Sequence, residues 1–289
     1  MLPKQEAMTR IAGLSIAGLL LLAGPALAAG SSDVAALQVA LRARGLYAGT
    51  VDGVQGPSTA NALIAFQRKT GLEPDGVAGS LTRAALGRFG GPDLGSRTLA
   101  LGAVGWDVAE LQFLLAWHGF PSDRFDGVFG THVEVAVRRY QRFAGLPAVG
   151  VAGPETIASL SAPPPRSPMT LAWPLNAPIG DPFGPRGTRF HAGIDLRAAA
   201  GVPVAAAAPG RVVFAGPRGT FGNTVIVAHG DGVRTLYAHL SRIDVTVGQR
   251  VGAAAEVGLV GATGDASGPH LHFEVRVRGA AVDPLSALP

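Results

Sequence analysis

The N-terminal half of the chain contains an internal duplication, and this feature constrains the possible fold more than any other. Residues 33–86 align with residues 107–160 without an insertion or deletion. Identical residues occur along the whole alignment: Leu37/Leu111, Gln38/Gln112, Asp52/Asp126, Gly53/Gly127, Gly56/Gly130, Gln67/Gln141, Gly71/Gly145, Gly76/Gly150 and Thr82/Thr156. A gapless match of about 50 residues indicates two copies of one structural unit rather than similar composition.

Apolar residues within each copy recur at the spacing of a helix. The first copy has stripes at Val34, Leu37 and Leu41 and at Ala62, Leu63 and Phe66, and a short third segment ends at Leu86. Gly45 and Gly71 stand where helices should end, and Asp52-Gly53 is typical of a turn. The pattern predicts two small all-α domains of three helices each, at residues 30–89 and 98–162.

The same residues form a longer pattern in each copy: V-x-x-L-Q, D-G-x-x-G, A-x-x-x-[FY]-Q and G-x-x-G-x-x-T. This pattern resembles the peptidoglycan-binding type 1 domain, and each copy covers nearly all of it. The second copy also has the leading Leu101-Gly102, which the first copy lacks, and Val133 stands where the first copy has Thr59. The resemblance implies peptidoglycan as the partner of this half of the chain.

The first residues of the chain are typical of an export signal. Lys4 and Arg10 precede the apolar run IAGLSIAGLLLLAGPALAA, which closes with the A-x-A cleavage pattern at residues 26–28. An uncleaved membrane anchor is the alternative, because the run has roughly the ~20 residues that a spanning helix needs. We expect residues 1–28 to be a cleaved signal peptide, since Gly24-Pro25 favours cleavage. The mature protein would then have no membrane span and lie in the periplasm, the cell wall or outside the cell.

Composition narrows the chemistry further. The chain has no cysteine, which excludes disulfides, thiolate metal sites and a cysteine nucleophile, so any metal ligands must come from His, Asp or Glu. Lys and Arg number 24 against 20 Asp and Glu, without a basic run, so nucleic acid is not expected as a partner.

The C-terminal part has a different character. A proline-rich run, SAPPPRSPM (161–169), leads into it, and we place a linker at residues 163–170. From Leu171 onward, short β-type runs alternate with Gly and Pro, and Asp231-Gly232 is a hairpin signal. These patterns predict an antiparallel all-β domain over residues 171–289.

Five of the seven histidines lie in this predicted β domain: His191, His229, His239, His270 and His272. Asp195 follows His191 by four residues, and a carboxylate with two imidazoles is the ligand set of a catalytic zinc with an open fourth position. His270 and His272 lie in the strand-like run SGPHLHFEV, where alternation points both side chains to the same face.

Three short motifs then stand in order across the domain: HAGID, LYAHLS and GPHLHFEV. Together they resemble the lysostaphin-type zinc metallopeptidases. The resemblance implies that His191, Asp195 and His272 bind one Zn²⁺ per chain and that His239 and His270 are catalytic histidines that do not bind metal. It also implies a lysostaphin-like fold.

Two polar residues near these motifs match no metal-ligand or catalytic position of the family. His229 fills no ligand position, so a structural role is expected. Glu274 shares the face of His270 and His272 by parity, and it could support the site or pair with a neighbouring arginine.

The sequence therefore predicts an exported zinc endopeptidase that cleaves peptide cross-links of peptidoglycan and is held on the wall by two binding modules. Two alternatives stay open: a catalytically silent regulator that activates cell-wall amidases, and a wall-anchoring protein. The oligomeric state is not indicated.

Overall fold

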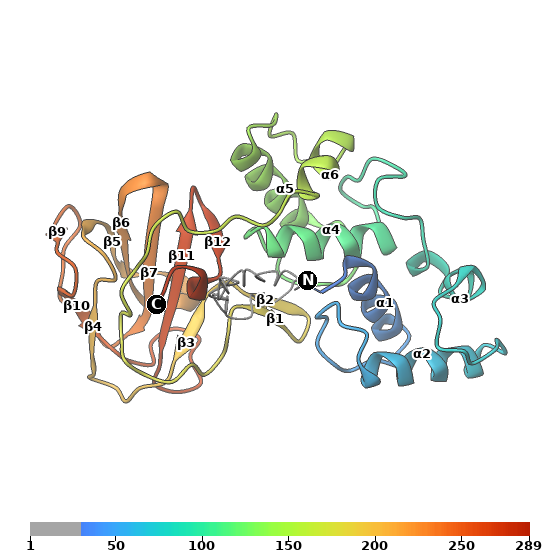
Figure 1. Ribbon diagram of the computed structural model, residues 1–289, viewed down its shortest axis with the longest axis horizontal. Coiled ribbons are helices and arrows are strands. Elements are labelled where there is room, and N and C mark those ends of the chain that lie inside the picture. Colours follow the sequence, from blue (N-terminus) through green and yellow to red (C-terminus); the bar gives the residue numbers. More distant parts are fainter. Residues whose placement is uncertain (1–29) are drawn as a thin grey trace, which may run out of the picture.

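The computed structural model describes residues 30–289, and the predicted signal peptide at residues 1–28 lies outside this range. Helices make up the first part of the described chain and strands the second, and the two parts lie side by side (Figure 1). Among the described residues, no helix combines the length and the apolar character needed to cross a membrane.

Each repeat folds into three helices, as predicted. The first copy forms α1 (Ser32–Ala43), α2 (Pro57–Lys69) and α3 (Ser80–Ala85), followed by the short helix η1 (Gly87–Phe89), and the second forms α4 (Trp106–Trp117), α5 (Thr131–Ala144) and α6 (Pro154–Leu160). In both copies a buried glutamine of the first helix secures the Asp-Gly turn. Gln38 donates to Asp52 Oδ1 (2.7 Å) and accepts from the Gly53 amide (2.9 Å), and Gln112 repeats both contacts in the second copy. These repeated glutamines therefore stabilise the fold of each module.

The two modules share one apolar core where α1 lies against α4. Ala36 and Ala40 of α1 and Phe113 of α4 are buried in this core, and small side chains on one helix allow the two backbones to approach closely. The duplication thus produces a single helical unit with an internal interface.

The C-terminal part is an antiparallel all-β domain, as predicted. Its main sheet has the strand order β12-β11-β7-β6-β5-β9, with β3 paired to β11. These strands are β3 (Ile194–Leu196), β5 (Gly210–Pro217), β6 (Asn223–Ala228), β7 (Val233–Leu240), β9 (Arg250–Val251), β11 (Leu271–Val277) and β12 (Ala280–Val282). Two smaller sheets contain β1 (Gly184–Arg186) with β2 (Arg189–His191), and β4 (Pro203–Ala205), β10 (Glu256–Leu259) and β8 (Arg242–Ile243). Short helical turns lie at η2 (Gly219–Phe221), η3 (Gly230–Gly232) and η4 (Pro284–Ser286).

Side chains along β11 alternate between the two faces of the main sheet. Leu271, Phe273 and Val275 point into the apolar core of the β domain. The intervening residues, His272 and Glu274 among them, therefore lie on the opposite face. The predicted hairpin is present as well: Asp231 and Gly232 adopt φ values of 55° and 72° between β6 and β7.

The second module docks directly onto the β domain. Trp117, at the end of α4, packs edge-on against Phe183 and Phe190, with ring centroids 6.2 Å and 5.4 Å away. Beside it, the Ala281 amide donates to the Gly119 carbonyl (3.1 Å). Gly119 has a φ of 86°, and a Cβ atom there would lie 2.3 Å from the Ala281 carbonyl oxygen, so this approach requires glycine. The proline-rich linker is thus accompanied by a packed interface between the second module and the β domain.

Candidate metal and catalytic site

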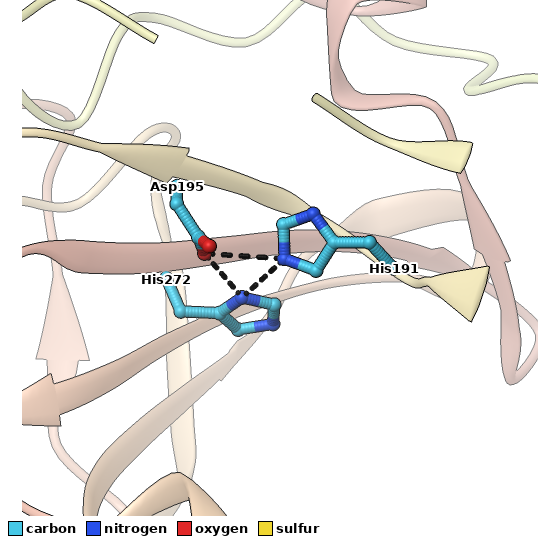
Figure 2. A group of neighbouring side chains, drawn as sticks. All are labelled: His191, Asp195 and His272. Carbon is cyan, nitrogen blue, oxygen red and sulfur yellow. Dashed lines mark hydrogen bonds and ion pairs between the residues drawn. The ribbon is translucent and has the colours of Figure 1, made fainter. Parts of the chain in front are cut away.

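Strand pairing brings together residues that are far apart in the sequence. Asp195 of β3 lies opposite His272 of β11, and β2 ends at His191 in the neighbouring hairpin. Figure 2 shows these three side chains converging on one point. His191 and His272 are buried, and the Asp195 side chain is 13% exposed.

The three donor atoms are close enough to share one ion. His191 Nε2 lies 3.1 Å from Asp195 Oδ1, His272 Nδ1 lies 2.8 Å from the same oxygen, and the two ring nitrogens are 3.0 Å apart. A tetrahedral zinc with ligand bonds of ~2.0–2.1 Å places its donors roughly 3.3 Å apart, so the triad needs only a slight expansion to accept it.

Neighbouring acceptors orient the lone pairs of both rings toward this point. His191 Nδ1 donates to the Pro182 carbonyl (2.8 Å), which leaves its Nε2 facing the other two donor atoms. His272 Nε2 donates to Glu274 Oε1 (3.2 Å), which leaves Nδ1 facing the same point. Two nitrogen lone pairs and one carboxylate oxygen can then converge on a divalent cation, which would displace any proton shared among the three donors.

Glu274 holds the second of these orienting contacts, and parity along β11 was the only signal for it in the sequence. Its side chain is 1% exposed, and its other oxygen accepts from Arg276 Nε at 2.6 Å. Burial by itself raises the pKa of Glu274, but the charge of Arg276 and the hydrogen bond from His272 lower it to about 2. The carboxylate is therefore ionised, and both roles considered for it, support of the site and an arginine pair, occur together.

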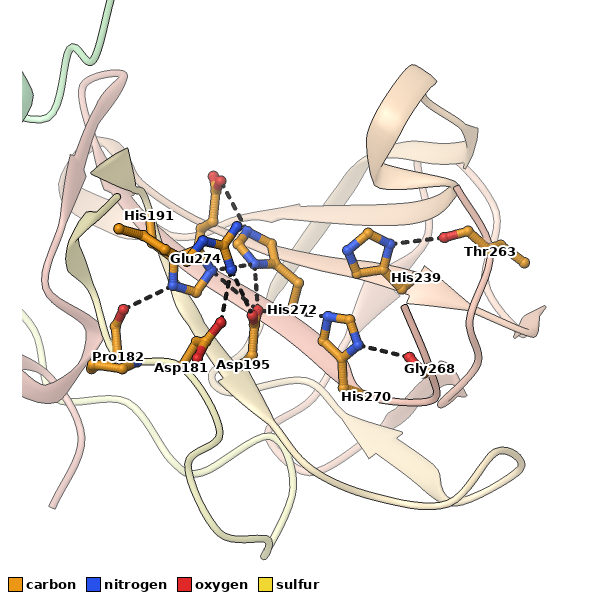
Figure 3. A network of polar contacts seen from close by, with 11 residues as sticks. Asp181, Pro182, His191, Asp195, His239, Thr263, Gly268, His270, His272 and Glu274 are labelled. Carbon is orange, nitrogen blue, oxygen red and sulfur yellow. Dashed lines mark hydrogen bonds and ion pairs between the residues drawn. The ribbon is translucent and has the colours of Figure 1, made fainter. Parts of the chain in front are cut away.

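The other two predicted site histidines lie beside the triad without joining it (Figure 3). The rings of His239 and His270 are 4.7 Å apart, and His270 Nε2 is 3.7 Å from Asp195 Oδ1, which is beyond hydrogen-bond distance. Each ring donates through Nδ1 to a main-chain carbonyl, His239 to Thr263 (2.8 Å) and His270 to Gly268 (2.9 Å). Both Nε2 atoms are consequently left as acceptors.

His239 reaches this position because β7 is irregular. Tyr237 and Leu240 both face the core, although residues three apart on a regular strand face opposite sides. The register of β6 against β7 shifts at this place, and His239 adopts a φ of 61°, a left-handed value that is uncommon for histidine. The extra residue turns the imidazole out of the core, and such local strain is typical of functional sites.

Burial lowers the pKa of His239, and the nearby His270 and His272 rings lower it further, while the hydrogen bond to Thr263 opposes the shift. The ring is therefore neutral at physiological pH, with Nε2 able to accept a proton.

All five predicted site residues line one groove of about 1,230 Å³. Pro121 and Asp123 of the second module form part of its edge, where Asp123 lies 3.4 Å from Arg189. Arg186, which the sequence patterns did not indicate, also lines the groove, with Nη1 at 3.7 Å from Asp195. His229 is not part of this group: it contacts the Pro209 carbonyl and the Thr235 hydroxyl, both at 2.8 Å.

Comparison with known proteins agrees with this geometry. The sequence model of "Peptidase family M23" matches residues 189–284, and that of "Putative peptidoglycan binding domain" matches residues 30–86 and 105–160. The "DD-carboxypeptidase/endopeptidase Mpg" of Neisseria meningitidis is 46% identical over 118 residues, which cover 38% of this chain and 27% of that protein.

A second curated protein and a solved structure are also similar to this chain. The "Murein hydrolase activator NlpD" of Escherichia coli is 38% identical over 122 residues, which cover 42% of this chain and 31% of that protein. The solved catalytic domain of lysostaphin from Staphylococcus simulans is 34% identical, with 38% of this chain and 90% of that domain covered and a TM-score of 0.36.

The matches with the two curated relatives span 27% and 31% of their lengths. The segment that matches the peptidase model lies in the β domain that carries the histidines. The two segments that match the peptidoglycan-binding model are the two helical repeats. The C-terminal part of the chain therefore carries a domain that matches peptidase family M23, and the N-terminal half carries two that match the peptidoglycan-binding domain.

Proposed function

We propose that this protein is an exported, zinc-dependent endopeptidase that hydrolyses peptide cross-links of bacterial peptidoglycan. The observation that carries the proposal is the groove itself, in which a complete metal-ligand triad lies beside two further histidines with free acceptor nitrogens. A donor set of one carboxylate and two imidazoles favours zinc among the common divalent ions, since magnesium and calcium prefer oxygen ligands.

His191, Asp195 and His272 would hold the ion. When bound, zinc would polarise the carbonyl of the scissile amide and make a water molecule more acidic at neutral pH. The neutral His239 has its Nε2 placed to accept a proton from the attacking water, because its Nδ1 is engaged by Thr263. His270, oriented by Gly268, is placed to donate a hydrogen bond to the developing oxyanion once its Nε2 carries a proton.

The two modules would hold the enzyme on its polymeric substrate and raise the local concentration of cross-links. Because the second module is packed on the β domain and borders the groove, bound wall material would be presented at a defined distance from the site. Attachment to peptidoglycan next to the groove supports the proposal that the protein acts in the cell envelope.

The activator NlpD among the relatives makes regulation of a separate amidase the second candidate function. The intact donor triad favours hydrolysis over this alternative. A protein that only activates another enzyme has no need for three converging donor atoms.

Purified sacculi of known cross-link chemistry, analysed by mass spectrometry, provide the test. Wild-type protein should release cleaved cross-linked peptides, and His239→Asn should release none while still binding zinc. Asparagine is chosen because it tolerates the left-handed backbone at this position. His132→Ala, at an exposed histidine of the second module, should behave as wild type.

Two outcomes would contradict the proposal. If wild-type protein releases no peptides but stimulates an added amidase, the regulator function is correct. If it binds sacculi without either effect, the protein serves as an anchor.

A further inference from the structure

A second cavity lies between the second module and the β domain. Its volume is about 370 Å³, within the usual range for small-ligand sites. Its lining comes from α5 and from the face of the main sheet opposite the core, where β6, β7 and β11 contribute residues. Six arginines from both parts of the chain line it: Arg139, Arg142, Arg218, Arg234, Arg276 and Arg278.

The positive charge of this cavity is almost uncompensated. Among the described residues, Arg276 alone of the six has a carboxylate partner, Glu274, and this carboxylate also accepts from His272. The other five arginines form no ion pair within residues 30–289. Aromatic rings support three of them instead: Arg139 lies over Phe120, Arg278 over Phe143, and Arg218 over Phe214 and Phe221.

Partial burial makes two of these charges costly, whereas Arg142, Arg234 and Arg278 are exposed. Burial lowers the pKa of Arg139 and of Arg218, and the charge of Arg276 lowers both further. Repulsion between these like charges is less screened at the two partly buried residues, so a bound anion would lower the free energy of the folded chain. Guanidinium groups also offer paired N–H donors that match carboxylate and phosphate oxygens.

Comparison of the two repeats shows that the cavity is a specific feature of the second copy. Arg139 stands where the first copy has Ala65, and Phe143 stands where the first copy has Lys69. The first copy contacts the β domain through another segment, where the Val51 amide donates to the Gly187 carbonyl (2.8 Å). The substitutions therefore coincide with the place where the second module forms the cavity.

We propose that this cavity binds a compact anion with two or more negative charges, borne on carboxylate or phosphate groups, and that α5 and the main sheet hold it jointly. The site is separate from the histidine groove and does not depend on hydrolysis. Its ligand would link the second module to the β domain through contacts from both sides.

Isothermal titration calorimetry on the full chain, at constant ionic strength set with sodium chloride, tests this proposal. Inorganic phosphate and the acidic peptide triglutamate serve as separate probes. We expect one site per chain for at least one probe. Arg142→Gln should weaken binding by ~10-fold or more, the effect of one charge-assisted contact. Arg234→Gln, on the opposite wall, should do the same.

Arg68→Gln is the matched control. Arg68 occupies the position of Arg142 in the first repeat and is exposed, so it makes the same change of charge in the same fold without touching the cavity. Binding of phosphate alone would assign the site to phosphate groups, and binding of the peptide alone would assign it to carboxylates. Absence of binding for both probes, or equal weakening by Arg68→Gln, would overturn the proposal.

Discussion

Replacing Glu274 by glutamine removes one of two oxygens that a fully buried carboxylate offers to its neighbours. In the native chain one oxygen accepts from Arg276 at 2.6 Å and the other from His272 at 3.2 Å. Glutamine has one acceptor oxygen, and the shorter bond to the arginine should retain it. The amide NH₂ group would then face His272 Nε2, which can accept from it only by moving the ring proton to Nδ1, the atom that faces the metal.

Metal binding by the variant must therefore displace that proton or break the new hydrogen bond. Loss of an orienting partner of this kind typically costs 10–100-fold in metal affinity, or about 1.4–2.7 kcal/mol. We expect a loss of this size for zinc, measured by competition with a fluorescent chelator on the full chain. The measurement does not require hydrolysis, so it tests the site independently of the reaction.

Glu256→Gln is the matched control, because it makes the same charge change at an exposed residue of β10 that pairs with Arg242. It should leave zinc affinity unchanged. The melting temperature of each variant verifies that the fold is retained. An unchanged zinc affinity in a folded Glu274→Gln variant would refute the role given to this carboxylate.

Three further results are expected. His272→Ala should lose zinc in an elemental assay, whereas His270→Ala should keep zinc and release no peptides from sacculi; zinc loss in both would contradict the assigned division of roles. Burial raises the pKa of Glu110 from its ordinary 4.5 to about 7, so the folded chain favours the protonated form and the free energy of unfolding falls as pH rises through this window. Glu110→Gln should remove this pH dependence and stabilise the fold above pH 7 by at most roughly 3 kcal/mol in chemical denaturation; an unchanged pH profile would argue against it. Trp117→Ala should weaken docking of the second module by about 3–5 kcal/mol and split thermal unfolding into separate transitions in calorimetry, whereas one unchanged transition would show that this contact is dispensable.

Much of the architecture follows from local patterns along the chain. The duplication at residues 33–86 and 107–160 predicts two helical modules because each copy repeats its turn glycines and apolar stripes, and the structure has three helices in each. The β character of the C-terminal part follows from its short apolar runs, and the Asp231-Gly232 turn suits the positive φ values that the hairpin requires.

The sequence also named the side chains that meet in the groove, but the division of roles among them came from a family resemblance. Parity alone places His270 and His272 on one face and leaves open which of them binds metal. The structure separates them, because only His272 has Asp195 directly opposite on β3 and Glu274 behind its other nitrogen. The assignment of metal binding to His191, Asp195 and His272 and of catalytic roles to His239 and His270 stays a prediction.

By itself, the sequence determined which elements form and which donor atoms are available, since helix stripes, turns and strand alternation depend on neighbours a few residues apart. Tertiary structure decided the rest. The register shift in β7 turns His239 toward the groove, against simple alternation. Arg142 and Arg276 line one cavity only because the second module docks on the sheet. These features depend on strand register and on contacts between distant segments, and short-range patterns carry no information about either.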